Sequence, residues 1–451
     1  MAPPTKNWTS WKRWTADGPR EATVAETRAA GKTVSIHTHG CKLNQADSQV
    51  LARQFQQAGF TVVNSPGKAD VVVLNSCTVT ATSDSKARQY LRRARRANPD
   101  ALVIATGCYA QRAKEDLSAM EAVSLVLDNR EKEALVATVA GHLKTTNAAP
   151  LEIGQGAQGR SRAMVKIQEG CDQVCAYCIV PKVRGRERSI PPEQIIGEIN
   201  NWGAGGCHEA VLTGTQLGTY GHDLPGTDLK GLIRRVLAET DIDRLRVSSL
   251  QPQEITPDLL SLWDDKRLCP HFHIPLQSGS DTILRAMRRR YDTEQFSQTV
   301  ELVRKTVPHA GITADIIVGF PGEGVREFAE SYSFALSTGF SDIHVFPYSI
   351  RPGTSAAYLD GQVDSALKKE RTGEMLELAA SCASNFRRAS LGQTRPVLWE
   401  PRKAQESTQW WSGLTDNYLR VRTQYDKDLG NVITNARLIA LDQDWLTSEV
   451  V

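Results

Sequence analysis

Short apolar runs alternate with longer amphipathic segments along the chain from residue 32 onward. The first three runs are TVSIHTHGC, DVVVLNSC and ALVIATGC. Each is rich in β-branched residues and presents no polar face, as expected of a parallel strand with helices on both sides. The stretches between them, such as SDSKARQYLRRARRA, have the pattern of helices. We therefore expect an α/β fold in which residues 32–150 form an N-terminal, doubly wound parallel sheet.

Six further apolar runs follow at intervals of about 30 to 40 residues. They are AMVKIQEG, EAVLTG, RLRVSSL, HFHIPLQ, ITADIIVGF and DIHVFPYS, and amphipathic segments such as DLKGLIRRVLAET separate them. Six strand-helix units predict an open, partial (β/α)6 barrel over residues 151–390, with its chemistry at the carboxyl ends of the strands. The residues at those ends are Thr213, Gly214, Ser248, Ser249, Gln277 and Gly319.

The two ends of the chain have different patterns. Over residues 391–451 the runs RPVLWEP, NYLRVRTQ and NVITNARLIAL are separated by Gly and Asp turns, which predicts a small C-terminal β-barrel. Residues 1–31 mix Pro, Thr, Lys and Arg with three tryptophans and have no sustained period. We interpret them as a poorly ordered tail and assign them no function.

With 451 residues, 40% of them hydrophobic, the chain is long enough for two or three domains, each with its own core. It has no run of about 20 apolar residues and no apolar core of a signal peptide, so we expect a cytoplasmic protein without a membrane partner. The net charge of only +3 means that any nucleic-acid site must be a local patch. In a reducing compartment, nine cysteines indicate metal or redox chemistry rather than disulfides.

Three of the cysteines, Cys41, Cys77 and Cys108, stand where the first three predicted strands end. The carboxyl ends of parallel strands meet at one edge of a sheet, so these thiols are expected to converge. A single cysteine at such a place is usually a small packing residue. Three repeats of one pattern favour a three-thiolate site instead.

Cys171, Cys175 and Cys178 stand in the loop after AMVKIQEG, with spacings of four and three. A structural zinc site normally has four ligands, and no further Cys or His follows Cys178 at a usual interval. Cys207 and His208 come much later, beside the next predicted strand. Three thiolates suit a 4Fe-4S cluster whose fourth iron stays open to an exogenous ligand. A zinc staple is the alternative.

The spacing of this loop, with Tyr177 before its last cysteine, resembles the signature of the radical S-adenosylmethionine superfamily. The resemblance implies that the open iron binds the amino and carboxylate groups of S-adenosylmethionine, and that an electron from the cluster releases a 5′-deoxyadenosyl radical. It also implies that Thr213 and Gly214 lie against the methionine moiety, that Ile317 to Gly319 line the adenine, and that Ser249 contacts the same cofactor. Core packing is the alternative for each of these residues.

Seven motifs in order resemble the methylthiotransferase family along residues 32–390. They are GCKLNQ, NSCTVT, GCYAQ, KIQEGCDQVCAYCIVP, HIPLQSGSD, DIIVGFPGE and FPYSIRPGT. This resemblance implies a radical enzyme with two 4Fe-4S clusters, of which the auxiliary one is held by Cys41, Cys77 and Cys108. It also implies two molecules of S-adenosylmethionine: one gives a methyl group to a sulfur on the auxiliary cluster, and the other generates a radical that abstracts hydrogen from carbon 2 of a base.

Within the family, NSCTVT followed by DSKARQ, LTGTQLGTYG, AMRRRY and HVFPYS are most similar to the bacterial branch that acts on threonylcarbamoyladenosine at position 37 of tRNA. Other branches act on isopentenyladenosine at that position or on an aspartate of a ribosomal protein, and an ordinary radical methylase also stays open. The implied partners are the anticodon loop of tRNA and an electron donor such as flavodoxin or ferredoxin. Gln251, in SSLQPQE, stands where this branch is expected to have Glu.

A protein of a different class is also an alternative: a non-catalytic iron-sulfur carrier or a zinc-containing RNA-binding protein. Zinc, or clusters with all of their irons ligated by the protein, would distinguish it from an enzyme.

The C-terminal segment resembles the TRAM-type RNA-binding domain of this family. Stacking surfaces and cations, which RNA loops require, are combined in Trp410, Trp411, Tyr418, Arg420 and Arg422. Aromatic residues also fill the cores of small barrels, which is the alternative for each of them. We interpret the basic run Arg92, Arg93, Arg95 and Arg96 as a solvated helix face rather than as a phosphate site. No ligand spacing fits Cys207, Cys269 and Cys382, which we interpret as structural.

Overall fold

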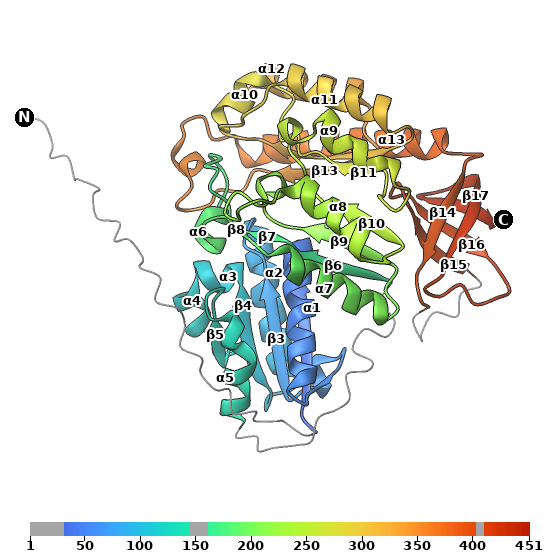
Figure 1. The fold of residues 1–451 in the computed structure, drawn as a ribbon. Coiled ribbons are helices and arrows are strands. Elements are labelled where there is room, and N and C mark those ends of the chain that lie inside the picture. Colours follow the sequence, from blue (N-terminus) through green and yellow to red (C-terminus); the bar gives the residue numbers. More distant parts are fainter. Residues whose placement is uncertain (1–30, 144–160, 403–409) are drawn as a thin grey trace, which may run out of the picture.

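The N-terminal part of the chain forms a sheet of five parallel strands in the order β2-β1-β3-β4-β5 (Figure 1). The computed structural model describes residues 31–143, 161–402 and 410–451, so all but the last residue of the predicted tail lies outside the described residues. The predicted domain boundaries stay predictions. The strands are β1 (Thr33–His39), β2 (Thr61–Val62), β3 (Val71–Ser76), β4 (Leu102–Gly107) and β5 (Leu125–Leu127). The sequence pattern missed β2 and β5, which are short edge strands.

Helices cover both faces of this sheet, which confirms the doubly wound prediction. Val71 and Val73 pack under the helices of one face, and Val72 and Leu74 under those of the other. The first face carries α1 (Lys42–Gln57) and α5 (Leu135–His142). The second carries α2 (Ala81–Ala97), α3 (Cys108–Arg112) and α4 (Lys114–Ser118). Strand β1 departs from the expected pattern, because His37 stays partly exposed and stacks on Tyr90 of α2.

The basic run Arg92, Arg93, Arg95 and Arg96 lies at the C-terminal end of α2. Thr80 caps the helix by accepting a hydrogen bond from the Ser83 N–H, and basic residues lie in the last turn, where they complement the helix dipole. Arg95 donates hydrogen bonds to the carbonyls of Pro99 and Ala101. Arg92 and Arg93 are exposed on the same helix, as the interpretation of a solvated face requires.

The central part is an open barrel of six parallel strands, as predicted. Two three-stranded sheets, β10-β9-β6 and β11-β12-β13, are joined by parallel bridges from Leu245 to Leu268 and from Ser249 to His273. In the described part of the chain, the edge strands β6 and β13 do not pair with each other. The six strands are β6 (Arg162–Lys166), β9 (Glu209–Thr213), β10 (Arg244–Val247), β11 (His271–His273), β12 (Gly311–Val318) and β13 (Asp342–Pro347).

Helices surround this barrel on its outer side and bury one continuous apolar core against it. The longer ones are α7 (Pro192–Ala204), α8 (Leu229–Glu239), α11 (Thr293–Thr306), α12 (Val325–Thr338) and α13 (Ser365–Ala389). Shorter elements at the ends of the barrel strands are α6 (Val180–Arg184), α9 (Pro257–Leu260), α10 (Asp281–Ala286), β7 (Gln168–Glu169) and β8 (Arg188–Ser189). No helix within the described residues has the length and apolar character needed to cross a bilayer.

The C-terminal part forms a closed barrel of five strands beside the central one (Figure 1). Trp399, Val421 and Leu446 fill its core. In barrel order the strands are β14 (Thr394–Trp399), β15 (Trp410–Thr415), β16 (Arg420–Gln424), β18 (Trp445–Val450) and β17 (Ile433–Asp442). The prediction of a small β-barrel is confirmed, although the sequence pattern indicated only three of its runs.

Asp47 of α1 connects the N-terminal sheet to the central barrel through a buried ion cluster. Its carboxylate accepts hydrogen bonds from Lys132 (2.9 Å), Lys166 of β6 (2.9 Å) and Arg184 of α6 (3.2 Å). Burial alone would raise the pKa of Asp47, but the charges of these cations outweigh it and hold the pKa well below its usual range. Since the pKa is lower in the folded state, the cluster stabilises the fold at neutral pH and loses that contribution only in strongly acidic solution.

Replacing Asp47 with asparagine should lower the free energy of unfolding by about 3 kcal/mol at neutral pH, because three cations would lose their shared buried counter-charge. Urea denaturation followed by circular dichroism measures the change. The matched control is Glu193→Gln, which breaks an ion pair with Arg235 at the surface and should leave the denaturation midpoint unchanged. Equal midpoints for the two variants would contradict the assigned role of Asp47.

Candidate iron-sulfur and radical site

The three strand-end cysteines lie together at the carboxyl edge of the N-terminal sheet. β1, β3 and β4 are neighbours, and their last residues, His39, Ser76 and Gly107, are paired across the sheet. Cys41, Cys77 and Cys108 follow these strands directly or after one glycine. The edge of the sheet therefore brings the three sulfurs together.

Close backbone contacts hold this edge in shape. A Cβ on Gly40 would lie 2.8 Å from the Cys77 Cβ, so only glycine fits there. Gly107 has a φ of +93°, and a Cβ on it would lie 2.5 Å from the Asn75 side-chain oxygen. Asn75 in turn donates to the Asn44 carbonyl (2.9 Å), which fixes the start of α1 against β3.

Burial keeps the Cys77 thiol neutral in the protein without a metal. It raises the pKa of Cys77 to about 12, with further contributions from Cys41 and Cys108. Thiolates are the metal-binding form, so a bound cluster would displace this proton.

The loop cysteines follow β7 at the carboxyl end of the central barrel. Burial raises the pKa of Cys171 to about 11 and that of Cys178 to about 12. The loop is anchored at Ala176, whose N–H donates to the Met287 carbonyl (3.0 Å) and whose carbonyl accepts from the Ala356 N–H (2.8 Å). These contacts fix the loop to segments more than a hundred residues away in sequence.

The two sets of cysteines approach each other where α3 meets α6. Cys108, the first residue of α3, packs against Ile179 and Val183, and Ile179 directly follows Cys178. The Asn129 amide lies 3.8 Å from the Cys108 sulfur and donates to the Val183 carbonyl at 2.7 Å. The sequence could not predict this contact, because it joins the edge of the N-terminal sheet to a helix of the central barrel.

The spacing of both sets argues against a single metal ion in either. Two sulfurs bound to one zinc ion, each about 2.3 Å from it, cannot lie more than about 4.6 Å apart. Within the described residues, only His273, Asp315 and His344 form a group of three ligand atoms inside 4.8 Å, and neither cysteine set does. A 4Fe-4S cube, in which each thiolate binds a different iron, accommodates three thiols at a larger spacing.

The predicted cofactor residues surround the same end of the barrel. Thr213 ends β9, and Gly214 follows it so closely packed that a Cβ would lie 2.9 Å from the Gln168 carbonyl oxygen. Ser248 and Ser249 follow β10, while Gln277 and Gly319 lie beyond β11 and β12. Tyr177 is edge-on to Phe320. Their contact with a cofactor stays a prediction.

Arg289, in the AMRRRY motif, is a site residue that the sequence interpretation missed. Its guanidinium donates to the Cys175 sulfur (3.4 Å), to the Gln251 side-chain oxygen (3.2 Å) and to the Tyr291 hydroxyl (3.1 Å). The guanidinium therefore adjoins the sulfur that would carry an iron. The signal was available in the three consecutive arginines, but only the fold decides that the second one points inward.

Gln251 also has a structural explanation. Its amide nitrogen donates to the side-chain oxygens of Gln173 (3.1 Å) and Gln216 (2.5 Å), which a carboxylate at this position could not do. Gln216 donates in turn to Glu254, and burial raises the pKa of Glu254 to about 7. The carboxylate expected at position 251 is thus replaced by a donor, while Glu254 supplies a carboxylate nearby.

Polar side chains line the inner face of the barrel, which the sequence analysis did not predict. Leu245, Val247 and Ile316 point outward into the helical core. The alternate residues bond to one another across the inner face: Glu209, Arg244, Arg246, His271, His273, Thr313, Asp315 and His344. The period of two in RLRV, HFH and DIHVF was the available signal.

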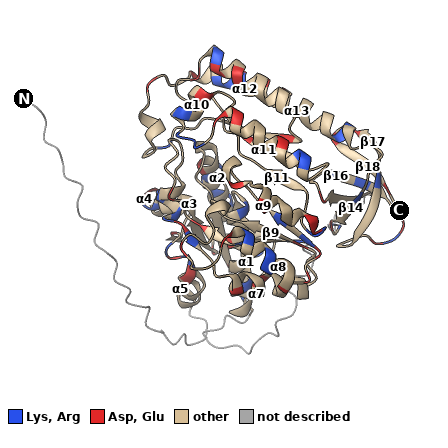
Figure 2. Cartoon of the chain, turned by 45° about the horizontal axis from the view of Figure 1, so that its top comes forward, with Lys and Arg blue, Asp and Glu red and all other residues tan. Residues whose placement is uncertain are grey.

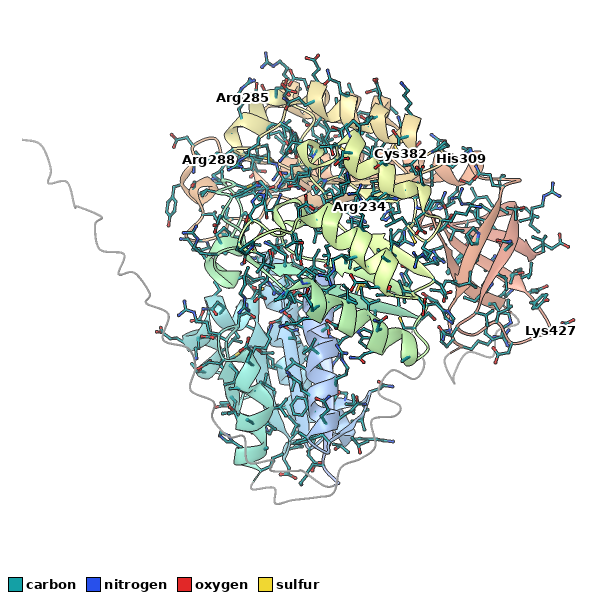
Figure 3. The ribbon with its side chains drawn as sticks, in the orientation of Figure 1. Arg234, Arg285, Arg288, His309, Cys382 and Lys427 are labelled. Carbon is teal, nitrogen blue, oxygen red and sulfur yellow. The ribbon has the colours of Figure 1, made fainter. Side chains whose placement is uncertain are left out.

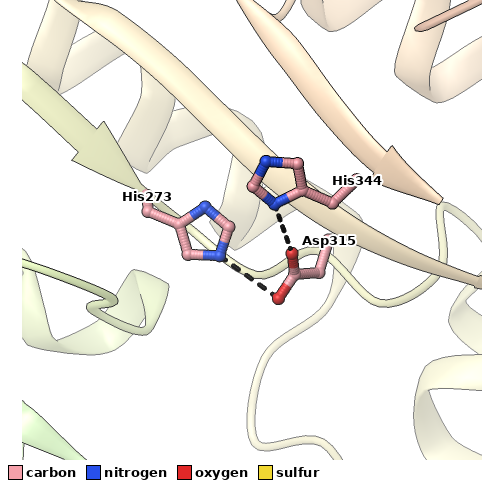
Figure 4. A group of neighbouring side chains, drawn as sticks. All are labelled: His273, Asp315 and His344. Carbon is pink, nitrogen blue, oxygen red and sulfur yellow. Dashed lines mark hydrogen bonds and ion pairs between the residues drawn. The ribbon is translucent and has the colours of Figure 1, made fainter. Parts of the chain in front are cut away.

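Asp315 bridges two histidines on this inner face (Figure 4). Its carboxylate oxygens lie 3.2 Å from the His273 Nε2 and 3.1 Å from the His344 Nδ1. The spacing would suit a divalent ion, but the group has only one carboxylate and lies beside the cations of Arg246 and Lys42. We therefore assign the three residues to a hydrogen-bonded group rather than to a metal site.

The aromatic residues of the C-terminal barrel divide between two positions. Trp411 lies in the barrel core, and the Tyr418 ring stacks on His271 of the central barrel at 4.3 Å. The Arg422 guanidinium lies over the Trp410 ring at 4.7 Å and pairs with Asp442, and Arg420 is exposed on the same strand. The alternative of core packing is thus right for Trp411.

The remaining cysteines, Cys207, Cys269 and Cys382, are buried. Cys207 donates to the carbonyls of Ser161 (3.5 Å) and Glu209 (3.4 Å), and Cys382 lies within α13 (Figure 3). Their burial fits the structural interpretation.

Comparison with known proteins identifies the family. Residues 165–335 match the Radical SAM superfamily, and residues 33–128 match an uncharacterized protein family, UPF0004. The threonylcarbamoyladenosine tRNA methylthiotransferase MtaB of Bacillus subtilis is 35% identical over 90% of this chain and 94% of its own length. The chain belongs to the radical S-adenosylmethionine methylthiotransferase family. It is a radical S-adenosylmethionine enzyme, as the sequence motifs predicted.

This methylthiotransferase is also similar to a second named enzyme in sequence and to a solved enzyme in fold. A tRNA-2-methylthio-N(6)-dimethylallyladenosine synthase from Mycolicibacterium paratuberculosis is 34% identical over 84% of this chain and 78% of its own length. The solved radical S-adenosylmethionine methyltransferase TsrM of Kitasatospora setae aligns over 72% of this chain and 75% of its own, with a TM-score of 0.53 and 13% identity. The latter likeness concerns the fold alone.

Proposed function

We propose that this enzyme methylthiolates threonylcarbamoyladenosine at position 37 of tRNA to its 2-methylthio derivative. The observation that carries the proposal is the contact of Cys108 with Ile179, the residue after Cys178, which places one set of three thiols next to the loop that carries the other set. Radical formation needs only one such set, whereas transfer of a sulfur-containing group needs a second place to hold the sulfur. Similarity to relatives named for this nucleoside, over 90% of the chain, supports the substrate.

In this proposal each set of thiols holds one 4Fe-4S cluster. Cys171, Cys175 and Cys178 hold the radical cluster, and Cys41, Cys77 and Cys108 hold the auxiliary one. When bound, the two clusters and two molecules of S-adenosylmethionine supply the electron, the radical and the thiomethyl group. An electron donor such as flavodoxin or ferredoxin is the proposed reductant.

The chain's own side chains position these groups. Tyr177, Thr213, Gly214, Ser249 and Gly319 are the proposed contacts of S-adenosylmethionine at the carboxyl ends of the barrel strands. Arg289, which donates to the Cys175 sulfur, orients that ligand and offsets its negative charge when it is ionised.

The proposed tRNA surface begins at the rim of the site. Arg285, Arg288 and Arg290 are exposed on and after α10, and Figure 3 shows Arg285 and Arg288 at the edge of the molecule. Met287, between them in the chain, is bonded to the cysteine loop at Ala176. Basic and acidic positions are intermixed along the ribbon (Figure 2), and these three arginines lie within six residues of the chain, where they would suit the anticodon-loop phosphates.

The reconstituted enzyme should convert threonylcarbamoyladenosine-containing tRNA to a product that carries one thiomethyl group in place of a hydrogen. Mass spectrometry of the digested nucleosides, after anaerobic incubation with reductant and S-adenosylmethionine, measures the conversion. The matched substrate is tRNA with isopentenyladenosine at the same position. It is included because another similar protein is named as a tRNA-2-methylthio-N(6)-dimethylallyladenosine synthase. Product from that substrate alone would contradict the assignment, and zinc in place of iron would contradict enzymatic function altogether.

A further inference from the structure

Lys42 stands at the junction of all three parts of the chain. It follows Cys41 and is the first residue of α1, which packs against β6 of the central barrel through Gln49, whose side-chain oxygen accepts from the Met164 N–H (2.9 Å). The Lys42 ammonium lies 6.0 Å from the centre of the Tyr418 ring of the C-terminal barrel. It is also close enough to Asp315 for the carboxylate charge to act on it. The lysine therefore faces the inner surface of the central barrel.

Lys42 lacks a counter-ion among the residues that the structure describes, in which it forms neither a hydrogen bond nor an ion pair. The nearby carboxylates are already engaged. Glu209 pairs with Arg244 (3.2 Å) and Arg246 (3.0 Å), and Asp315 accepts from its two histidines. Arg244 and Arg246 thus share Glu209, whereas Lys42 has no carboxylate of its own within the described residues. A half-buried charge without a partner is unfavourable, so this surface favours an anionic ligand.

The inner surface near Lys42 is open on the side of β12 and β13. The His344 side chain is 50% exposed, although its partner Asp315 is largely buried. Phe346, two residues further along β13 and thus on the same face, is 41% exposed. An exposed aromatic ring on the same barrel face as an unpaired cation suits a ligand that combines a flat base with a negative charge.

We propose that Lys42 binds the carboxylate of the threonylcarbamoyl group on the substrate adenosine, while Phe346 packs against the base. The inference rests on the proposed function and adds the residue that selects the nucleoside. An isopentenyl group has no charge to offer Lys42, and its burial beside unpaired charges is unfavourable. The threonylcarbamoyl group supplies the missing negative charge.

The test compares two anticodon stem-loops, one with threonylcarbamoyladenosine and one in which its carboxylate is converted to a neutral carboxamide. Affinities are measured by fluorescence anisotropy with the reconstituted enzyme. The wild-type enzyme should prefer the carboxylate roughly 10- to 100-fold, as expected for a hydrogen bond to a charged group. In Lys42→Gln this preference should disappear, and Lys42→Arg should retain most of it. Because the ratio is taken within one protein, it does not depend on the cluster content of each variant.

Lys68→Gln, at an exposed site in the same domain, is the matched control and should keep the wild-type ratio. A wild-type ratio near one, or an unchanged ratio in Lys42→Gln, would overturn the role of Lys42. These results are distinguishable from failure of the proposed function, which would appear as absence of thiomethylated product from threonylcarbamoyladenosine with the wild-type enzyme.

Discussion

Cys175→Ala should abolish the reductive cleavage of S-adenosylmethionine. The variant removes one of three thiolates in the loop, and with it the sulfur to which Arg289 donates a hydrogen bond. A 4Fe-4S cluster on two remaining thiolates is not expected to survive, so no electron would be available. The measurement is 5′-deoxyadenosine formation by the anaerobically reconstituted, reduced protein.

The matched control for this variant is Cys382→Ala. Cys382 is also buried, but it lies within α13 among core side chains. Its replacement should leave cleavage at the wild-type rate. If Cys175→Ala formed deoxyadenosine at the wild-type rate, the assignment of this loop to the radical cluster would be wrong.

Cys77→Ala should separate radical formation from sulfur transfer. Cys77 belongs to the sheet-edge set, and the loop cysteines keep their own anchors at Met287 and Ala356. The variant should still cleave S-adenosylmethionine but should form no thiomethylated nucleoside, because the second set of thiols is incomplete. Its iron content should fall from about eight to about four per chain if each set holds one cube.

Two measurements on the same preparation test this expectation. Iron is determined after anaerobic reconstitution, and deoxyadenosine and modified nucleoside are quantified from one reaction. Normal amounts of thiomethylated nucleoside from Cys77→Ala would return the sheet-edge cysteines to a packing role. Loss of both activities would instead mean that the two sets depend on each other through the contact of Cys108 with Ile179.

Much of the site could be predicted because its signals are local in sequence. A parallel strand has a recognisable run of apolar residues, and its end has a fixed place in the sheet. Cys41, Cys77 and Cys108 could therefore be assigned to one edge from three strand ends alone. The spacing of the loop cysteines is likewise a property of a few consecutive residues.

Other interpretations failed or stayed open because the same local pattern has two structural outcomes. Tyr418 and Trp411 both looked like stacking surfaces for RNA, yet one lies on His271 and the other in the barrel core. An aromatic residue in a short strand gives the same signal whichever neighbour it meets. From the sequence, Gln251 was only a residue that replaces an expected glutamate. The structure shows that its side-chain amide donates hydrogen bonds to Gln173 and Gln216, which a glutamate could not do.

The sequence by itself determined the order of the three folds, the strands that carry the cysteines and the family. The folds and the strands follow from periodicity and spacing, which act over a few residues to a few tens of residues, and the family follows from the resemblance of the motifs. The tertiary structure alone decided which side chains meet across domains. The Asp47 cluster, the contact of Cys108 with Ile179 and the position of Lys42 each join segments of separate elements. Such contacts form between the surfaces of folded domains. They produce no periodic pattern in the sequence, so periodicity cannot predict them.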